Sequence, residues 1–253
     1  MNNQPWEAIF NKYKISLHDF RKAPFIITAE QIKRATAHFK QTNEREVRIL
    51  CKQDTREERP KVFADKGLFL LPIKNGIYAI VKGEGYLDIP MITETAQFYT
   101  SKLNFNLDTA KVGNSEMQHL DFAYASSIIR TFLNDDTIVL TIRGRKYTPK
   151  FDFKVGSQRI EVTGVQTEVD GGYEGKDQVV LIEAKNSETD NVIIRQLFYP
   201  FRQWSHHTKK KVVTLFFEKR ANAYLLWQFQ FKDINDYNSI YLAKSKKFEI
   251  VDR

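Results

Sequence analysis

The sequence predicts an α/β (α+β) protein, in which a central mixed sheet flanked by helices follows a largely helical N-terminal region. Apolar residues recur at helical spacing near the N-terminus and again around residues 115–133. Short apolar runs bounded by turn residues follow each of these stretches, as expected for strands. Of the 253 residues, 42% are hydrophobic and 28% are charged, which is the composition of a globular protein with a sizeable core.

Residues 1–95 are predicted to form an N-terminal α+β region. Its first helix is indicated by apolar residues at helical spacing, namely Trp6, Ile9, Phe10 and Tyr13. Thr28 followed by Gln31 has the spacing of a capping box, so a second helix is expected from there to about Lys40. Another helix is expected over residues 44–51.

A hairpin is predicted where Asn75-Gly76 separates two apolar runs, because this dipeptide favours the tightest hairpin turns. Helices followed by a hairpin are typical of a winged-helix-like module. An ordinary α+β subdomain has the same pattern, so the sequence leaves both interpretations open. The region is expected to contact DNA or to support a dimer.

Residues 96–253 are predicted to form the catalytic domain. A helix is expected over residues 115–133, and another over residues 192–204. Predicted strands occupy residues 137–143, 147–153, 159–168, 170–174, 179–185, 212–217 and 224–231.

The segment of this domain that is expected to carry the active site runs from residue 168 to residue 185. If it is a hairpin that turns at Lys176-Asp177, facing residues have numbers that sum to 353, so Asp170 lies opposite Glu183. Lys185 follows on the same face, because side chains alternate along a strand. Facing carboxylates repel each other, and a hard cation such as Mg²⁺ relieves that repulsion. Gly171 and Gly172 are expected to let a ligand approach the backbone closely.

These residues resemble the active site of the PD-(D/E)xK nuclease superfamily. In that superfamily an acid at one strand start and Glu-x-Lys at the end of the next strand form the site. The resemblance covers most of the second region, and it departs from the motif where Val169 replaces the proline before the aspartate. It implies a restriction-endonuclease-like fold, with Asp170, Glu183 and Lys185 as catalytic residues and Mg²⁺, or Mn²⁺ in its place, as cofactor.

Three further segments resemble one group of type II restriction endonucleases, namely residues 48–54, 71–78 and 194–202. This resemblance implies sequence-specific cleavage of double-stranded DNA and a cognate DNA methyltransferase as genetic partner. A homodimer is expected, because cutting both strands of a symmetric site needs two active sites.

Other residues are candidates for the same site. Glu116 opens the helix predicted at residue 115 and is either a further metal ligand or an acid favoured by the helix dipole. The remaining candidates either contact DNA phosphates or belong to an ordinary solvated surface. They are Arg195, Gln196, Arg202, Arg143, Arg145 and Lys146.

Composition excludes several other classes of protein. The net charge of +8 fits a polyanionic partner. The single cysteine, Cys51, excludes an internal disulfide and a thiolate zinc site, and it favours a cytoplasmic location. Adjacent His206 and His207 cannot easily share a metal ion. We expect no membrane span and no nucleotide cofactor, since no long apolar run, P-loop or dinucleotide motif is present.

Two alternatives remain open. One is a repair or recombination nuclease of the same fold, and the other is a non-catalytic DNA-binding regulator. Discrete cleavage products favour restriction, whereas DNA binding without Mg²⁺-dependent cleavage favours the regulator.

Overall fold

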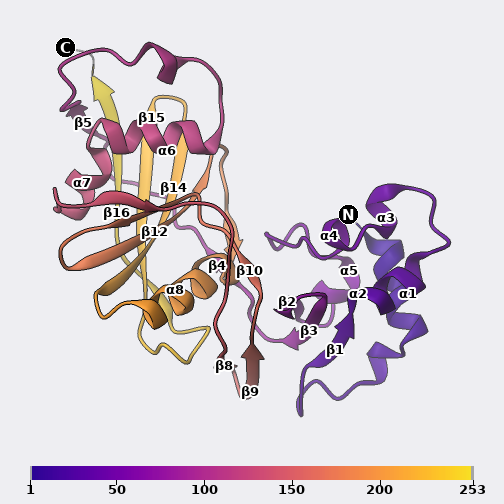
Figure 1. Ribbon diagram of the computed structural model, residues 1–253. Helices are drawn as coiled ribbons and strands as arrows, with labels where there is room; N and C mark the ends of the chain where they lie inside the picture. The colour runs from indigo at the N-terminus through magenta and orange to yellow at the C-terminus, as the bar shows by residue number, and fades with distance from the viewer. Residues whose placement is uncertain (1, 252–253) are drawn as a thin grey trace.

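The N-terminal part of the computed structural model, which describes residues 2–251, is a helical module closed by a small sheet (Figure 1). Buried apolar side chains from its helices and its sheet form one core, which includes Trp6, Phe63 and Leu70. Its strands pair antiparallel in the order β1-β3-β2. Its elements are α1 (Asn3–Lys12), η1 (Ile15–Leu17), β1 (Phe25–Thr28), α2 (Ala29–Thr36), α3 (Thr42–Arg45), α4 (Val47–Leu50), α5 (Lys61–Ala64), β2 (Leu68–Lys74) and β3 (Ile77–Lys82).

The rest of the chain is built on a seven-stranded mixed sheet, with strand order β5-β16-β15-β14-β12-β11-β6. The strands β12 and β14 are parallel, and β6, β11 and β12 are antiparallel neighbours. Their bounds are β5 (Gln97–Thr100), β6 (Val139–Ile142), β11 (Gly171–Glu174), β12 (Gln178–Lys185), β14 (Lys211–Arg220), β15 (Ala223–Phe231) and β16 (Ile240–Val251).

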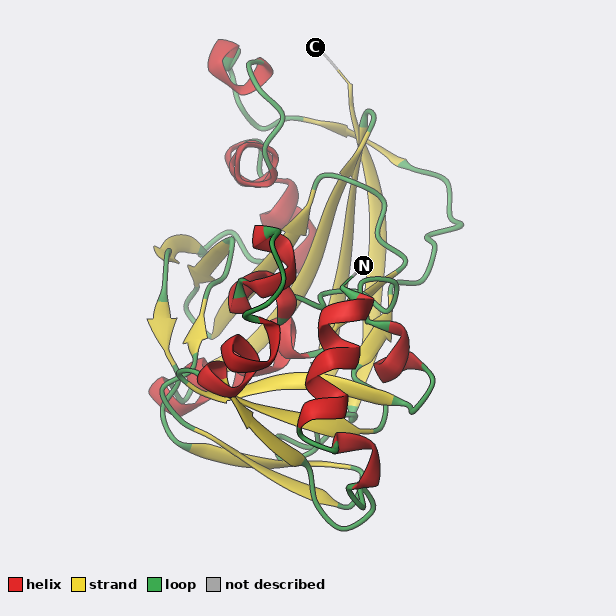
Figure 2. Cartoon of the chain, turned by 90° about the vertical axis from the view of Figure 1, so that its right-hand side faces the viewer, coloured by secondary structure: helices red, strands yellow, loops and turns green. Residues whose placement is uncertain are grey.

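Helices cover both faces of this sheet, which is strongly twisted when seen from the side (Figure 2). On one face lie α6 (Glu116–Ala125) and α7 (Ile128–Leu133), which pack on alternate residues of β12 and β14 such as Ile182 and Leu215. On the other face lies α8 (Arg195–His207), whose Leu197 packs with Phe216 and Trp227. Since β12 is buried on both faces, it reads as a continuous apolar run.

Short strands outside the main sheet join the two parts of the chain. The insertion between β6 and β11 forms an arm of four strands, β7 (Lys146–Tyr147), β8 (Phe151–Val155), β9 (Gln158–Val162) and β10 (Gln166–Thr167). The arm, α8 and the strands β2 and β3 share a second core, which includes Phe69, Phe153 and Phe198. Pairing of β4 (Tyr86–Asp88) with β13 (Asn191–Ile193) adds another link. The remaining element is the short η2 (Asp108–Lys111).

The structure confirms a mixed α/β protein with a large mixed sheet flanked by helices, and it corrects several predicted elements. The helix predicted over residues 115–133 is two helices, because Ser127 has a left-handed backbone (φ 70°) between them. Residues 147–153 and 159–168 lie mainly in the arm rather than in the main sheet. The strand β16 was not predicted. No helix of residues 2–251 is long and apolar enough to cross a membrane.

Candidate active site

The hairpin formed by β11 and β12 has the predicted register. Gly171 pairs with Ile182 and Gly172 with Leu181, so each facing pair sums to 353. The turn lies at Lys176-Asp177, where the Gly175 N–H donates to the Gln178 carbonyl (2.8 Å). The paired register ends at Gly171. The Asp170 N–H donates to the carbonyl of Ile182 (3.1 Å), the partner of Gly171, so the predicted pairing of Asp170 with Glu183 is not part of the ladder, although Asp170 lies against the same segment of β12.

Glu183 is a buried carboxylate at the centre of the site. Only 7% of the residue is exposed, although it is charged in its ordinary state. Its Oε1 accepts from Lys185 Nζ (2.6 Å) and from Gln196 Nε2 (2.8 Å), which comes from α8. Lys185 Nζ also donates to the Ala184 carbonyl (3.0 Å). The pair therefore has the hydrogen bonds that a buried ion pair requires.

The surroundings of Glu183 and Lys185 shift the pKa values of both side chains. Burial raises the pKa of Glu183 to about 7; Lys185 opposes this rise, and the charges of Asp170 and Asp54 add to it. Burial lowers the pKa of Lys185, but attraction to Glu183, and then to Glu116 and Asp170, outweighs burial and leaves the pKa above its usual value. Lys185 thus stays a cation, while Glu183 is held close to the point where a proton or a metal ion neutralises it.

Asp170 is fixed at the start of β11 by the neighbouring strand. Its Oδ2 accepts from the backbone N–H of Ala184 (2.7 Å), so one carboxylate oxygen is tied to β12. The neighbouring glycines do not leave room for a ligand, which corrects our prediction. A Cβ at Gly171 would lie 2.9 Å from Leu120 Cδ2, and one at Gly172 would lie 2.5 Å from Ile142 Cβ. These glycines allow close packing of the chain's own elements.

Glu116 lies in the first turn of α6, where Ser115 caps the helix by accepting from the Gln118 N–H (3.2 Å). Its charge acts on Lys185, so the helix brings Glu116 within electrostatic range of the predicted site. Both interpretations of Glu116, a metal ligand or an acid favoured by the helix dipole, remain open.

The donor set of this hairpin suits a hard divalent cation. Within residues 2–251, no three Asp, Glu, His or Cys side chains are already gathered as a metal site. The charge of Asp170 nevertheless acts on Glu183, and the buried Gln196 Oε1 next to Glu183 has no hydrogen-bond partner among the described residues. A small cation with bound waters would neutralise the Glu183 carboxylate, and one of its waters would donate to the unpaired Gln196 Oε1.

The candidate phosphate contacts on α8 have partners within the protein. Arg195 forms an ion pair with Asp54 (3.4 Å), and Gln196 is bound to Glu183. Arg202 Nη1 donates to the carbonyls of Asp152 (2.9 Å) and Ile234 (2.6 Å). These three side chains therefore hold the helix to its surroundings, and DNA contact by them stays a prediction.

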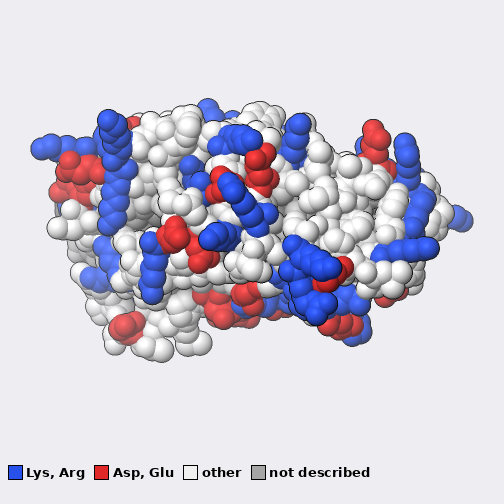
Figure 3. Space-filling view, turned by 90° about the horizontal axis from the view of Figure 1, so that it is seen from below, with Lys and Arg blue, Asp and Glu red and all other residues white. Residues whose placement is uncertain are grey.

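The other candidates lie around the turn between β6 and β7. Arg143 pairs with Asp121 of α6, Arg145 pairs with Glu168 (3.3 Å), and Lys146 is exposed. Seen from below, basic and acidic side chains are interspersed on the surface rather than separated into one positive patch (Figure 3). The charge pattern of this face does not by itself mark a path for DNA.

Two acids near the site were not singled out from the sequence. Asp54 comes from the N-terminal module, and its charge acts on Glu183. Glu218 lies beside Lys185 in the parallel register, is completely buried, and accepts from Arg220 (2.5 Å) and the Thr189 N–H (3.0 Å). No sequence motif marks Asp54 or Glu218, because each reaches the hairpin only through contacts between segments far apart in the chain.

Comparison with known families divides the chain near residue 80. The family model of a domain of unknown function, DUF6997, matches residues 81–249, and that of another, DUF6996, matches residues 3–80. No curated protein and no solved structure matches the chain. The junction falls within β3, at the end of the N-terminal module.

Proposed function

The chain belongs to the DUF6997 family over residues 81–249, the part that carries the hairpin, and we propose that it is a divalent-metal-dependent endodeoxyribonuclease. The observation that carries this proposal is the placement of three groups. Asp170 is hydrogen-bonded to Ile182 and Ala184, the residues on either side of the buried Glu183, and Lys185 contacts Glu183 at the end of the central strand β12. Two carboxylates that hold a cation beside a lysine suit hydrolysis of a phosphodiester.

The arrangement of the sheet supports a restriction-endonuclease-like fold. The strands run in the order β6-β11-β12-β14, antiparallel except for the last pair, and α8 connects the parallel strands β12 and β14. With α6 and α7 before them, this is a pair of helices, three antiparallel strands, a helix and a parallel strand. Active-site residues of the PD-(D/E)xK pattern occupy the second and third strands of such a unit.

In the proposed reaction, the carboxylates of Asp170 and Glu183 would hold the cation. The chemistry that a bound Mg²⁺ would supply there is polarisation of a phosphate oxygen and acidification of a bound water. Gln196 and the Ala184 N–H keep the two carboxylates in position through one oxygen each. Lys185 keeps a positive charge beside the scissile phosphate, anchored to the Ala184 carbonyl, and orients the attacking water.

The N-terminal module supports a DNA substrate. Its elements run helix, strand, helices, then two strands, with strand order β1-β3-β2. This is the order of a winged helix, a module that commonly holds duplex DNA. Residues 42–50, which form the short helices α3 and α4, would then face the DNA.

The narrower proposal is a type II restriction endonuclease. It includes a homodimer that cuts both strands, a cognate DNA methyltransferase as genetic partner, and a cytoplasmic location. The methyltransferase rests on the sequence resemblance, the homodimer on the two active sites that a double-strand cut needs, and the cytoplasmic location on the single cysteine, Cys51.

Incubation of unmethylated phage DNA with Mg²⁺ tests the proposal. Discrete fragments from the wild-type protein, and none from Asp170→Asn or in EDTA, are expected. A smear or structure-dependent nicks would indicate a repair nuclease instead, and a gel shift without any cleavage would indicate a DNA-binding regulator. An Asp177→Asn variant, changed in the turn of the same hairpin, is the matched control and should cleave like the wild type.

A further inference from the structure

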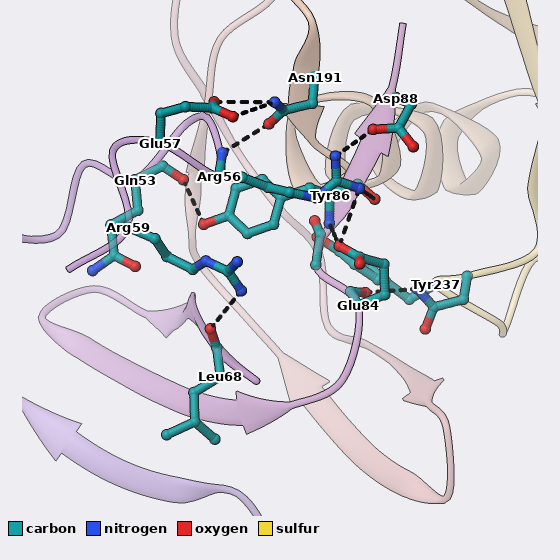
Figure 4. Close-up of polar contacts among 12 residues, drawn as sticks. Gln53, Arg56, Glu57, Arg59, Leu68, Glu84, Tyr86, Asp88, Asn191 and Tyr237 are labelled. Carbon is teal, nitrogen blue, oxygen red and sulfur yellow. Dashed lines mark hydrogen bonds and ion pairs between the residues drawn. The ribbon is translucent and has the colours of Figure 1, made fainter. Parts of the chain in front are cut away.

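The loop between α4 and α5, residues 51–60, binds the N-terminal module to the strand that leads into α8. The Ile193 N–H donates to the Asp54 carbonyl (2.8 Å), and the Arg56 N–H donates to Asn191 Oδ1 (2.7 Å). Asn191 Nδ2 in turn donates to Glu57 (3.0 Å). Figure 4 shows the contacts of Asn191 with Arg56 and Glu57. The loop is thus anchored on β13, directly before the helix that reaches the active site.

Two further contacts hold the same loop to β4. Tyr86 donates through its hydroxyl to the Gln53 carbonyl (3.2 Å), and Arg56 forms ion pairs with Asp88 and with Glu84 (3.5 Å) (Figure 4). Because both the backbone and the side chains of the loop are engaged, its position relative to β4 and β13 is well defined.

One side chain of this loop reaches α8 itself. Asp54 Oδ1 accepts from Arg195 Nη2 (3.4 Å), and the two side chains are only 20% and 24% exposed. Arg195 is the first residue of α8, and the residue before it, Ile194, gives the helix no side-chain cap. A carboxylate at this end of a helix is favoured by the helix dipole as well as by the ion pair.

The next residue of α8 touches the active site. Gln196 Nε2 donates to Glu183 Oε1 (2.8 Å), and the charge of Asp54 also acts on Glu183. A continuous set of contacts therefore runs from Asp54 through Arg195 and the first turn of α8 to Gln196 and Glu183.

We propose that Asp54 is a positioning residue of the active site, by which the N-terminal module sets the orientation of Gln196 and Glu183 through Arg195. The proposal rests on the proposed function, since it assigns Asp54 a role in holding the metal-binding carboxylate. It implies that the domain of residues 81–249 needs the N-terminal module for full activity as well as for contact with DNA.

The test compares Asp54→Asn with Asp54→Glu and with Arg56→Gln in the full chain. Mn²⁺ affinity by calorimetry gives a readout that needs no cleavage, and steady-state cleavage gives kcat and KM. Arg56→Gln is the matched control, because it breaks the ion pairs to Asp88 and Glu84 without reaching Arg195. Arg195→Lys is a second variant, which keeps the charge but loses the planar guanidinium.

Asp54→Asn and Arg195→Lys are expected to weaken Mn²⁺ binding and to lower kcat by about 10- to 100-fold, the usual effect of losing a partner behind a metal ligand. KM for DNA should change little. Asp54→Glu should restore most of both values, and Arg56→Gln should lower the melting temperature but keep the wild-type Mn²⁺ affinity.

Three results would overturn the inference. They are wild-type Mn²⁺ affinity in both Asp54→Asn and Arg195→Lys, an equal loss in Arg56→Gln, or no Mn²⁺ binding by the wild-type protein. If the wild type cleaves DNA and Asp54→Asn is unchanged, the positioning role alone fails. If the wild type binds Mn²⁺ in an Asp54-dependent way but cleaves no DNA, the nuclease proposal fails and the positioning role stands.

Discussion

The buried Glu183 should make the metal-free protein less stable as the pH rises. Burial is the main cause that raises its pKa from 4.5 to about 7, with Lys185 opposing and Asp170 adding to the rise. The folded state therefore binds more protons than the unfolded state between these two values, and stability falls with increasing pH across that range. At about 1.4 kcal/mol for each tenfold change in proton affinity, the whole loss is about 3 kcal/mol.

Urea unfolding in EDTA at several pH values between 5 and 8.5 measures this loss. Glu183→Gln removes the titrating group, so the difference in unfolding free energy between the two proteins should change by most of that amount over the range. Glu161→Gln, on the exposed edge of β9, is the control and should follow the wild type. Parallel curves for the wild type and Glu183→Gln would refute the reasoning. At pH 8, a Mg²⁺ concentration 100 times the dissociation constant should raise the unfolding free energy of the wild type by about 3 kcal/mol. The same concentration should not stabilise Glu183→Gln.

Three further variants test other parts of the account. Lys185→Met should reduce cleavage by about 10²- to 10³-fold while Mn²⁺ binding in calorimetry is retained; wild-type cleavage would exclude a role for the ammonium group. Gly172→Ala should lower the unfolding free energy by about 1–3 kcal/mol, because its Cβ would lie 2.5 Å from Ile142 Cβ, and an unchanged urea midpoint would contradict that packing. Thr28→Ala should cost about 1 kcal/mol, since Thr28 Oγ1 accepts from the Gln31 N–H (3.2 Å) at the start of α2; Thr28→Ser should restore it.

Local chemistry was sufficient to predict several parts of the fold. The capping box at Thr28 and Gln31 is present with both of its hydrogen bonds. The hairpin at Asn75-Gly76 is formed by β2 and β3, and Gly76 has the left-handed backbone (φ 71°) that this turn favours. The register of β11 against β12, in which facing residue numbers sum to 353, followed from the position of the turn alone. Each of these features is determined by residues close together in the chain.

Features that depend on distant partners were not predictable in this way. The strands β4 and β13 are three residues long and exist because they pair with each other. In β16, an edge strand along much of its length, exposed lysines such as Lys244 and Lys246 mask the alternation of polar and apolar residues. Asp54 reaches the active site only because the N-terminal module docks on β13, so no spacing in the sequence indicates it.

The central claim is that Asp170 and Glu183 together hold one divalent cation. The most direct measurement is anomalous diffraction from crystals of the full chain soaked in Mn²⁺. The account predicts a single strong peak between the carboxylates of Asp170 and Glu183, within about 2.0–2.3 Å of an oxygen from each, which is absent from crystals of Asp170→Asn. A crystal with no peak at this position, or with Mn²⁺ bound only elsewhere, would contradict it.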